Sequence, residues 1–170
     1  MENVAVVDLL DRIIGKTTKK HAHEKGLLHR TVIAEVVTSK GLILLVKQAS
    51  HKQDAGQFVL PVGGHVTAGE TPLEGLKREA KEELGITSFK EKFIGKAIFD
   101  RAVNKQRENH YFYVYEIDTD LIPVLNEESI AYTYLTVAEL KKQLQNNPEF
   151  FGDAFWFVVR TFYKQWVKDE

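Results

Sequence analysis

The 170-residue sequence has no cysteine, no long apolar run and almost no net charge. Without thiols it can form neither a disulfide nor a thiolate metal site, and it has no cysteine nucleophile. The formal net charge is −1, so the overall charge attracts neither nucleic acid nor an anionic membrane. No apolar run approaches the roughly 20 residues of a membrane-spanning helix. We therefore expect a cytoplasmic protein whose partner is neither a nucleic acid polymer nor a membrane.

Hydrophobic residues make up 44% of the chain, enough for a substantial core at this length. We expect one domain over residues 1–170. Strand patterns lie within 3–14 and at 28–38, 42–47, 57–62, 93–100, 111–117 and 131–135, with a polar loop at 102–109. Helical patterns lie at 71–84, 137–146 and 153–167. Because strands and helices mix without regular alternation, the fold class expected is α+β, in layers.

The segment from Gly64 to Glu83 carries the clearest local signals. Thr71 can cap a helix, and Pro72 suits the first helical position, where a missing N–H costs nothing. Glu74 stands three residues after Thr71 and completes a capping box. Gly85 can take the left-handed position that ends a helix.

This helix places three carboxylates side by side. Glu79, Glu82 and Glu83 have the spacing i, i+3, i+4, so their side chains are neighbours. Such carboxylates repel one another, and a hard cation such as Mg²⁺ or Mn²⁺ would relieve the repulsion. Arg78 can hold one of them by a bidentate contact. The alternative for an isolated Glu-rich helix is a solvated surface.

A glycine-rich loop precedes the helix. Gly63, Gly64 and Gly69 allow the backbone to approach a ligand closely or to adopt positive φ. Glycine loops and helix N-termini suit phosphate groups, and backbone carbonyls suit metal ions. The segment therefore predicts a site that holds a divalent metal against a phosphate chain.

The spacing of these residues resembles a known signature. The pattern G-x5-E-x7-R-E-U-x-E-E-x-G-U, in which U is aliphatic, is that of the Nudix hydrolases. It is matched by Gly64, Glu70, Arg78, Glu79, Ala80, Glu82, Glu83, Gly85 and Ile86. The resemblance implies a Nudix-type α/β/α sandwich with a mixed sheet and the signature at 64–86. An N-terminal extension would cover about 1–27 and a C-terminal helix about 153–168, and a homodimer is common for this fold.

The resemblance also implies roles for residues. Glu79, Glu82 and Glu83 would be ligands of Mg²⁺ or Mn²⁺, with the Gly64 carbonyl as a further ligand. Arg78 would orient Glu79 in the catalytic centre. Glu70 would brace the junction of loop and helix, in which Gly69 and Gly85 allow the turns. The implied reaction is attack of water on phosphorus in a small-molecule diphosphate.

The general base that takes the proton from water differs among members of this family. Glu79 is one candidate in this chain. Glutamates outside the signature are others, namely Glu108, Glu116, Glu127 and Glu128. We favour Glu128, because it precedes the strand at 131–135 much as family members place their base.

The flanking sequence is similar to the isopentenyl-diphosphate isomerase branch of the superfamily. The similarity lies at 28–30, 44–48, 52 and 63–65, with looser agreement at 150–156. The isomerase needs a cysteine where Gly63 stands, and an E-x-E where Glu108-Asn109-His110 stands. A hydrolase is therefore the expected function. An isomerase and a non-catalytic nucleotide-binding module are the alternatives.

A second metal site is implied by the same branch. His29 and His65 match histidines that bind metal in the isomerase. With Glu108, and with His21 or His23 as further candidates, they would form this site.

The sequence names no particular substrate, because groups outside the signature contact the part of a substrate beyond its diphosphate. Candidates for this contact are the segments 51–56 and 102–109 and the aromatic residues Phe99, Tyr111, Tyr113 and Phe155. Core packing explains most aromatic residues equally well.

Overall fold

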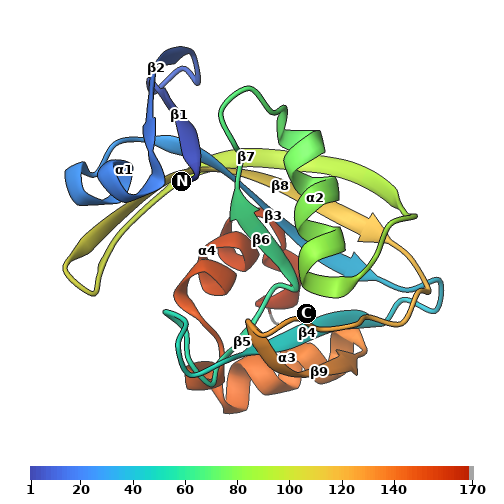
Figure 1. The fold of residues 1–170 in the computed structure, drawn as a ribbon. Coiled ribbons are helices and arrows are strands. Elements are labelled where there is room, and N and C mark those ends of the chain that lie inside the picture. Colours follow the sequence, from blue (N-terminus) through green and yellow to red (C-terminus); the bar gives the residue numbers. More distant parts are fainter. Residues whose placement is uncertain (169–170) are drawn as a thin grey trace.

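The computed structural model describes residues 1–168 and contains one large mixed sheet with helices on both faces (Figure 1). The strands are β1 (Asn3–Val7), β2 (Ile13–Thr18), β3 (His29–Val37), β4 (Ile43–Gln48), β5 (Phe58–Val59), β6 (Val62–His65), β7 (Lys90–Val103), β8 (Gln106–Asp118) and β9 (Ser129–Leu135). The helices are α1 (Lys19–Lys25), α2 (Pro72–Leu84), α3 (Val137–Asn146) and α4 (Asp153–Phe162), with 3₁₀ turns η1 (Pro148–Phe150) and η2 (Lys164–Trp166).

Strand β3 is the centre of the sheet. It pairs in parallel with β8 and antiparallel with β1, β4 and β6. Strand β7 extends the sheet beyond β8, and β9 extends it beyond β4. The sheet is therefore mixed, as the sequence predicted.

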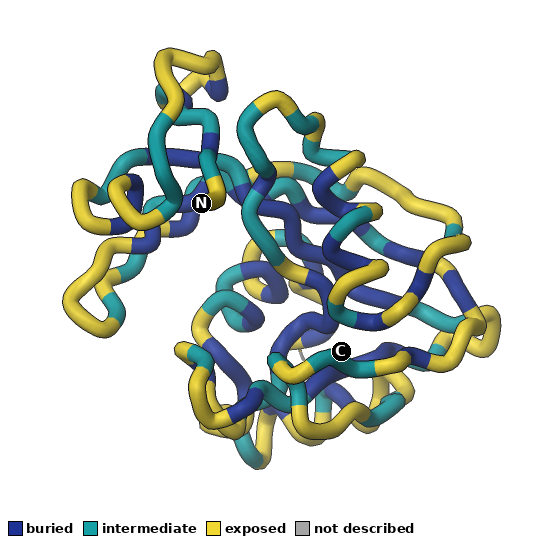
Figure 2. Tube along the Cα trace, in the orientation of Figure 1, coloured by how far each residue is buried: buried dark blue, intermediate teal, exposed yellow. Residues whose placement is uncertain are grey.

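Alternation of side chains along β3 divides the core into two layers. Val32 and Ala34 belong to a cluster that includes Leu76 of α2. Ile33 belongs to a second cluster, which includes Val158 of α4 and Leu140 of α3. Burial of alternate residues against helices on opposite faces makes the α/β/α sandwich that was predicted. Figure 2 shows the buried trace running through the sheet and along the inner sides of these helices.

The N-terminal segment folds more fully than predicted. The strand and turn expected at 3–14 form the β1–β2 hairpin, and α1 follows it. Thr18 caps α1 through its side chain, and Gly26 ends the helix at φ 63°. Short length and the lack of an apolar stripe hid this helix from sequence analysis. In Figure 1 the hairpin and α1, in blue, lie at one end of the sheet.

The prediction of a polar loop at 102–109 is wrong. These residues mostly belong to β7 and β8, which continue to a tight turn at Asn104 and Lys105. Both turn residues have positive φ, 49° and 62°, as in the hairpin turns that match strand twist. The hairpin extends past the apolar core, so its polar composition resembled that of a loop.

The C-terminal helix is shorter than expected. Helix α4 ends at Phe162, and Tyr163 leaves the helical conformation with φ −122° and ψ 48°. The rings of Tyr163 and Trp166 stack with centroids 4.5 Å apart, and both residues are buried. Packing of these two rings explains why the apolar pattern continues beyond the helix. No helix in the described part of the chain is long and apolar enough to cross a membrane.

Candidate active site

The junction between β6 and α2 has the local structure that the sequence predicted. The backbone N–H of Thr71 donates to Glu74 Oε2 at 2.7 Å, and that of Glu74 donates to Thr71 Oγ1 at 3.2 Å. Gly85 ends the helix at φ 65°, and Gly69 in the loop has φ 94°. These caps fix where α2 starts and therefore which of its side chains face the loop.

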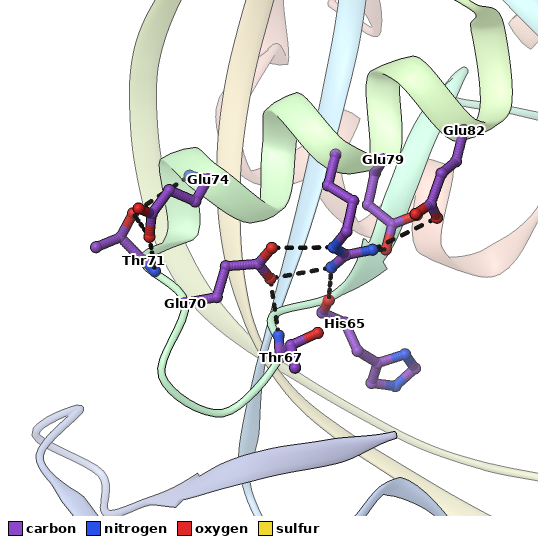
Figure 3. A network of polar contacts seen from close by, with 8 residues as sticks. His65, Thr67, Glu70, Thr71, Glu74, Glu79 and Glu82 are labelled. Atoms are coloured by element: carbon purple, nitrogen blue, oxygen red, sulfur yellow. Dashed lines mark hydrogen bonds and ion pairs between the residues drawn. The ribbon is translucent and has the colours of Figure 1, made fainter. Parts of the chain in front are cut away.

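The Arg78 guanidinium joins the loop to the helix. It donates to both carboxylate oxygens of Glu70, at 2.9 and 3.0 Å, and to the carbonyl of His65 at 2.8 Å. It also donates to Glu79 Oε1 at 2.6 Å. Glu70 in turn accepts from the backbone N–H of Thr67 at 2.9 Å. Figure 3 shows Glu70, Thr67 and the His65 backbone gathered at one side of this network, and Glu79 and Glu82 at the other.

The three glutamates of α2 differ in their surroundings. Glu79 is buried, Glu83 is half-buried and accepts from the Gly63 N–H at 2.8 Å, and Glu82 is exposed. Burial raises the pKa of Glu79 to about 7, against the opposing effect of Arg78. Burial also raises the pKa of Glu83 well above its usual range, and the charge of Glu79 adds to this rise.

Gly64 lies directly against the carboxylate of Glu79. A Cβ at this position would stand 2.1 Å from the carboxyl carbon of Glu79. The absence of a side chain therefore lets the backbone and the carboxylate share one small space. Glu79, Glu82 and Glu83 line one cavity, although among the described residues their oxygens do not converge as the ligand atoms of a metal-binding group do. Carboxylate oxygens are the donor type that Mg²⁺ and Mn²⁺ bind. The residues present fit such an ion.

A cavity of about 620 Å³ opens beside these residues. Its lining includes Glu79, Glu82 and Glu83 of α2, and the cations Lys52 and Arg101. The predicted aromatic residues divide between this cavity and the rest of the molecule. Phe99 and Phe155 line it, whereas Tyr113 lies on the opposite face of β8, where its hydroxyl bonds the carboxylate of Asp11. Tyr111 lies two residues before Tyr113 on β8 and therefore shares that opposite face.

The four candidates for the general base outside the signature differ in their position relative to the cavity. Glu128 lines the cavity and pairs with Lys52 at 3.0 Å. Glu108 lines it as well, but its carboxylate accepts from Arg101 at 2.6 Å. Neither Glu116 nor Glu127 is among the described residues of the cavity wall. Glu128 also adds to the raised pKa of Glu83, which places its charge near the carboxylates of α2.

Four histidines meet beside the cavity, and three of them line it. They are His23 of α1, His29 of β3, His65 of β6 and His110 of β8, and one ring nitrogen of each lies within 4.8 Å of the others. The Nε2 atom of His23 is 3.1 Å from that of His65 and 3.3 Å from that of His110.

The ring of His29 is held by the backbone through one nitrogen only. Its Nδ1 donates to the carbonyl of Leu27 at 2.7 Å, and its Nε2 is buried without a partner among the described residues. A backbone carbonyl on one ring nitrogen is the usual support for a histidine that ligates through the other. Burial lowers the pKa of His29 to about 4 and lowers those of the other three. All four rings are therefore neutral near pH 7, the form in which they bind metal.

The structure brings together only part of the predicted second site. His29 and His65 belong to the cluster. Of the two further candidates, His23 lies in the cluster, whereas His21 is exposed and lies outside it. Glu108 does not belong to the cluster. His110 was missed because its place in the strand was read as a lost carboxylate, although His110 and Glu108 share a face of β8.

Comparison with known proteins identifies the family. The NUDIX domain matches residues 27–155, so the chain belongs to the NUDIX family. One relative is isopentenyl-diphosphate Delta-isomerase 2 of Photorhabdus laumondii subsp. laumondii, 30% identical over an alignment of 161 residues that covers 92% of this chain and 88% of that protein. An uncharacterised Nudix hydrolase of Clostridium acetobutylicum is 29% identical over 155 residues, with coverage of 85% and 75%.

Solved structures agree on the fold. A crystal structure from Deinococcus radiodurans superposes with a TM-score of 0.74 at 23% identity, covering 95% of this chain and 99% of that one. A MutT protein from Methanosarcina mazei gives 0.64 at 24% identity, with coverage of 82% and 92%. The α+β sandwich is thus that of the Nudix proteins.

Proposed function

We propose that this protein is a Mg²⁺- or Mn²⁺-dependent hydrolase that cleaves the diphosphate linkage of a nucleoside diphosphate derivative or another small organic diphosphate. The observation that carries the proposal is the placement of Glu79, Glu82 and Glu83 of α2 in the lining of one cavity whose other groups include Lys52. Membership of the NUDIX family and similarity to a protein named as a Nudix hydrolase support it.

The roles of the residues follow from their contacts. Glu79, Glu82 and Glu83, with the Gly64 carbonyl, would hold the ion, which neutralises diphosphate charge and lowers the pKa of a bound water. Arg78 keeps Glu79 in place through the 2.6 Å contact. Lys52 provides a positive charge for a phosphate oxygen, and its pairing with Glu128 at 3.0 Å positions that carboxylate beside the cavity. Glu128 would take the proton from the attacking water.

Isomerisation is the second candidate, because the chain is similar to proteins named as isopentenyl-diphosphate isomerases. The chain has no cysteine, and Gly63 stands where the resemblance requires one. Incubation with isopentenyl diphosphate, followed by analysis for the dimethylallyl isomer, separates isomerase from hydrolase. Tight ligand binding without turnover in either Mg²⁺ or Mn²⁺ would instead indicate a non-catalytic nucleotide-binding module.

We also propose that the histidine cluster is a second metal site. Its ligands would be His23, His29, His65 and His110, which replaces the set with Glu108 expected from sequence. The orphaned Nε2 of His29 supports this proposal.

The location and assembly of the protein complete the proposal. We infer that the enzyme is cytoplasmic, because small diphosphates are abundant in the cytoplasm. We also infer that the chain acts as a single Nudix domain. A homodimer is common for this fold, and light scattering coupled to gel filtration would test it.

The decisive experiment is a screen of nucleoside triphosphates, dinucleotides, nucleotide sugars and isoprenoid diphosphates with Mg²⁺ or Mn²⁺ added. Wild-type protein should release phosphate or a monophosphate from at least one class. Glu82→Gln and Glu83→Gln should each lower kcat by orders of magnitude, whereas Glu127→Gln, an exposed glutamate outside the cavity wall, should not. If both signature variants retained wild-type activity, the assignment of these carboxylates would be wrong.

A further inference from the structure

A carboxylate beside the histidine cluster is kept out of it. Glu108 lies two residues before His110 on β8, so both side chains point to the same face of the sheet. Both line the cavity, and the charge of Glu108 acts on His23. Glu108 is nevertheless absent from the group of converging ligand atoms, which consists of imidazoles alone.

Arg101 explains this absence. It faces Glu108 directly across the β7–β8 pair, and its Nε donates to Glu108 Oε2 at 2.6 Å. The side chains of Arg101 and Glu108 are only 14% and 9% exposed. Separating a buried, hydrogen-bonded ion pair is unfavourable, because each charge would lose the partner that compensates for its burial. The carboxylate is therefore held toward β7 and away from the rings.

Two further carboxylates fix the guanidinium in this position. Arg101 Nη1 donates to Asp54 Oδ1 at 3.1 Å, and it pairs with Asp153 Oδ2 at 3.5 Å. Asp54 is buried and Asp153 is exposed. Asp54, before β5, and Asp153, at the start of α4, thus orient the Arg101 side chain. In this orientation the Nε of Arg101 is free to donate to Glu108.

The composition of the site decides which metal it takes. Neutral imidazoles suit Zn²⁺, Cu²⁺, Ni²⁺ and related ions, whereas carboxylates suit Mg²⁺ and Mn²⁺. Zn–N bonds of about 2.0–2.1 Å in a tetrahedron place neighbouring nitrogens about 3.3 Å apart. Two of the separations, 3.1 and 3.3 Å at His23, are near this spacing, and all the ligand nitrogens lie within 4.8 Å of one another.

We propose that Arg101 is a specificity-determining residue for the histidine site: by holding Glu108, it keeps the site free of carboxylate, so that the site binds a borderline transition metal such as Zn²⁺ in preference to Mg²⁺ or Mn²⁺. The inference rests on the proposed second metal site and is independent of the proposed hydrolase activity. One cavity would then hold two kinds of metal, hard ions on the α2 glutamates and a borderline ion on the histidines.

The test uses the full chain, stripped of metal and then loaded with Zn²⁺, Co²⁺ or Mn²⁺. Bound metal is measured by elemental analysis after dialysis against excess Mg²⁺, and Co²⁺ absorption reports the coordination number. Wild-type protein should retain one Zn²⁺ and show the intense visible bands of four-coordinate Co²⁺. His29→Ala should lose both. If wild-type protein retains no Zn²⁺, the second site and this inference fail together, while the hydrolysis assay still judges the proposed activity.

The role of Arg101 is tested by releasing Glu108. In Arg101→Gln the released Glu108 should become a fifth ligand, which weakens the Co²⁺ bands. The affinity for Mn²⁺ relative to that for Zn²⁺ should rise by about tenfold, the scale on which residues that support metal ligands act. Arg101→Gln combined with Glu108→Gln should restore the wild-type spectrum and preference. Arg12→Gln, which removes an exposed arginine paired with Asp8 and none of the contacts of Arg101, is the matched control. An unchanged spectrum and preference in a folded Arg101→Gln protein would overturn the proposal.

Glu108→Gln alone provides a test that does not depend on the folding of Arg101→Gln. Because Glu108 is proposed not to ligate, this nearly isosteric change should leave Zn²⁺ retention and the Co²⁺ spectrum unchanged. Loss of Zn²⁺, or a change in the Co²⁺ bands, would show that Glu108 is a ligand and would refute the role of Arg101.

Discussion

The Gly64 backbone and the Glu79 carboxylate occupy adjoining space, so close that a Cβ on Gly64 would stand 2.1 Å from the Glu79 carboxyl carbon. The contact joins the end of β6 to the middle of α2. It positions the most buried of the three signature glutamates against the loop.

Replacing Gly64 by alanine should therefore displace Glu79. We expect kcat with Mg²⁺ to fall by about 100-fold, the scale of an ångström-sized misplacement, and stability to fall by about 1–3 kcal/mol through overpacking. Steady-state kinetics and thermal unfolding measure the two effects. Gly15→Ala is the matched control, because a Cβ there meets nothing within 4 Å. Normal kcat in Gly64→Ala would mean that the position of Glu79 is not critical.

The fork of Arg78 should not be replaceable by lysine. Arg78 contacts Glu70, Glu79 and the His65 carbonyl at once, and an ammonium group cannot reproduce this planar geometry. Arg78→Lys should lower kcat about 10- to 100-fold, the scale of losing a residue that orients ligands. Glu74→Gln, which alters only the helix cap, should lower thermal stability slightly and leave kcat unchanged. Equal kcat in Arg78→Lys and wild type would contradict the positioning role.

Glu128 should behave as a general base. Glu128→Gln should lower kcat by about 10²–10⁴-fold, the scale of losing a general base. Glu127→Gln changes the neighbouring exposed carboxylate and should have no effect. A Glu128→Gln enzyme with the kcat of wild type would leave Glu79 as the candidate.

Glu35 predicts a pH dependence of stability that is separate from the site. It is 1% exposed and stands opposite Glu116 in the β3–β8 register. Burial, with the neighbouring carboxyl of Glu116, raises its pKa from 4.5 to about 9. The folded state thus keeps a proton that the unfolded state releases, so stability falls as pH rises from about 4.5 to 9 and then levels.

Glu35→Gln should remove this dependence, because the amide cannot ionise. The stability of the variant relative to wild type should rise with pH across this window, with a slope approaching about 1.4 kcal/mol per pH unit. Chemical denaturation at several pH values measures it. Glu24→Gln, at an exposed position, is the control. A constant difference between Glu35→Gln and wild type across the window would show that Glu35 ionises normally in the folded protein.

Local interactions explain the parts of the fold that the sequence predicted well. The capping box of Thr71 and Glu74, the left-handed Gly85 and the adjacency of Glu79, Glu82 and Glu83 all depend on residues within a few positions of one another. Helix α3 was likewise predicted with its bounds, Val137–Asn146. The errors of prediction lie at the β7–β8 hairpin and beyond Phe162, where sheet extension and tertiary packing decide the secondary structure.

The sequence by itself determined the capped helix with its three glutamates, the glycine loop before it and membership of a Nudix-like class, because spacing along one helix sets which side chains are neighbours. Only the tertiary structure decided the composition of the histidine cluster. His23 and His110 are 87 positions apart and meet because α1 packs beside β8. The tertiary structure also shows that Glu108 lies outside that cluster, because it pairs with Arg101. The register between β7 and β8 makes these two residues partners, and short-range spacing in the sequence does not reveal that register.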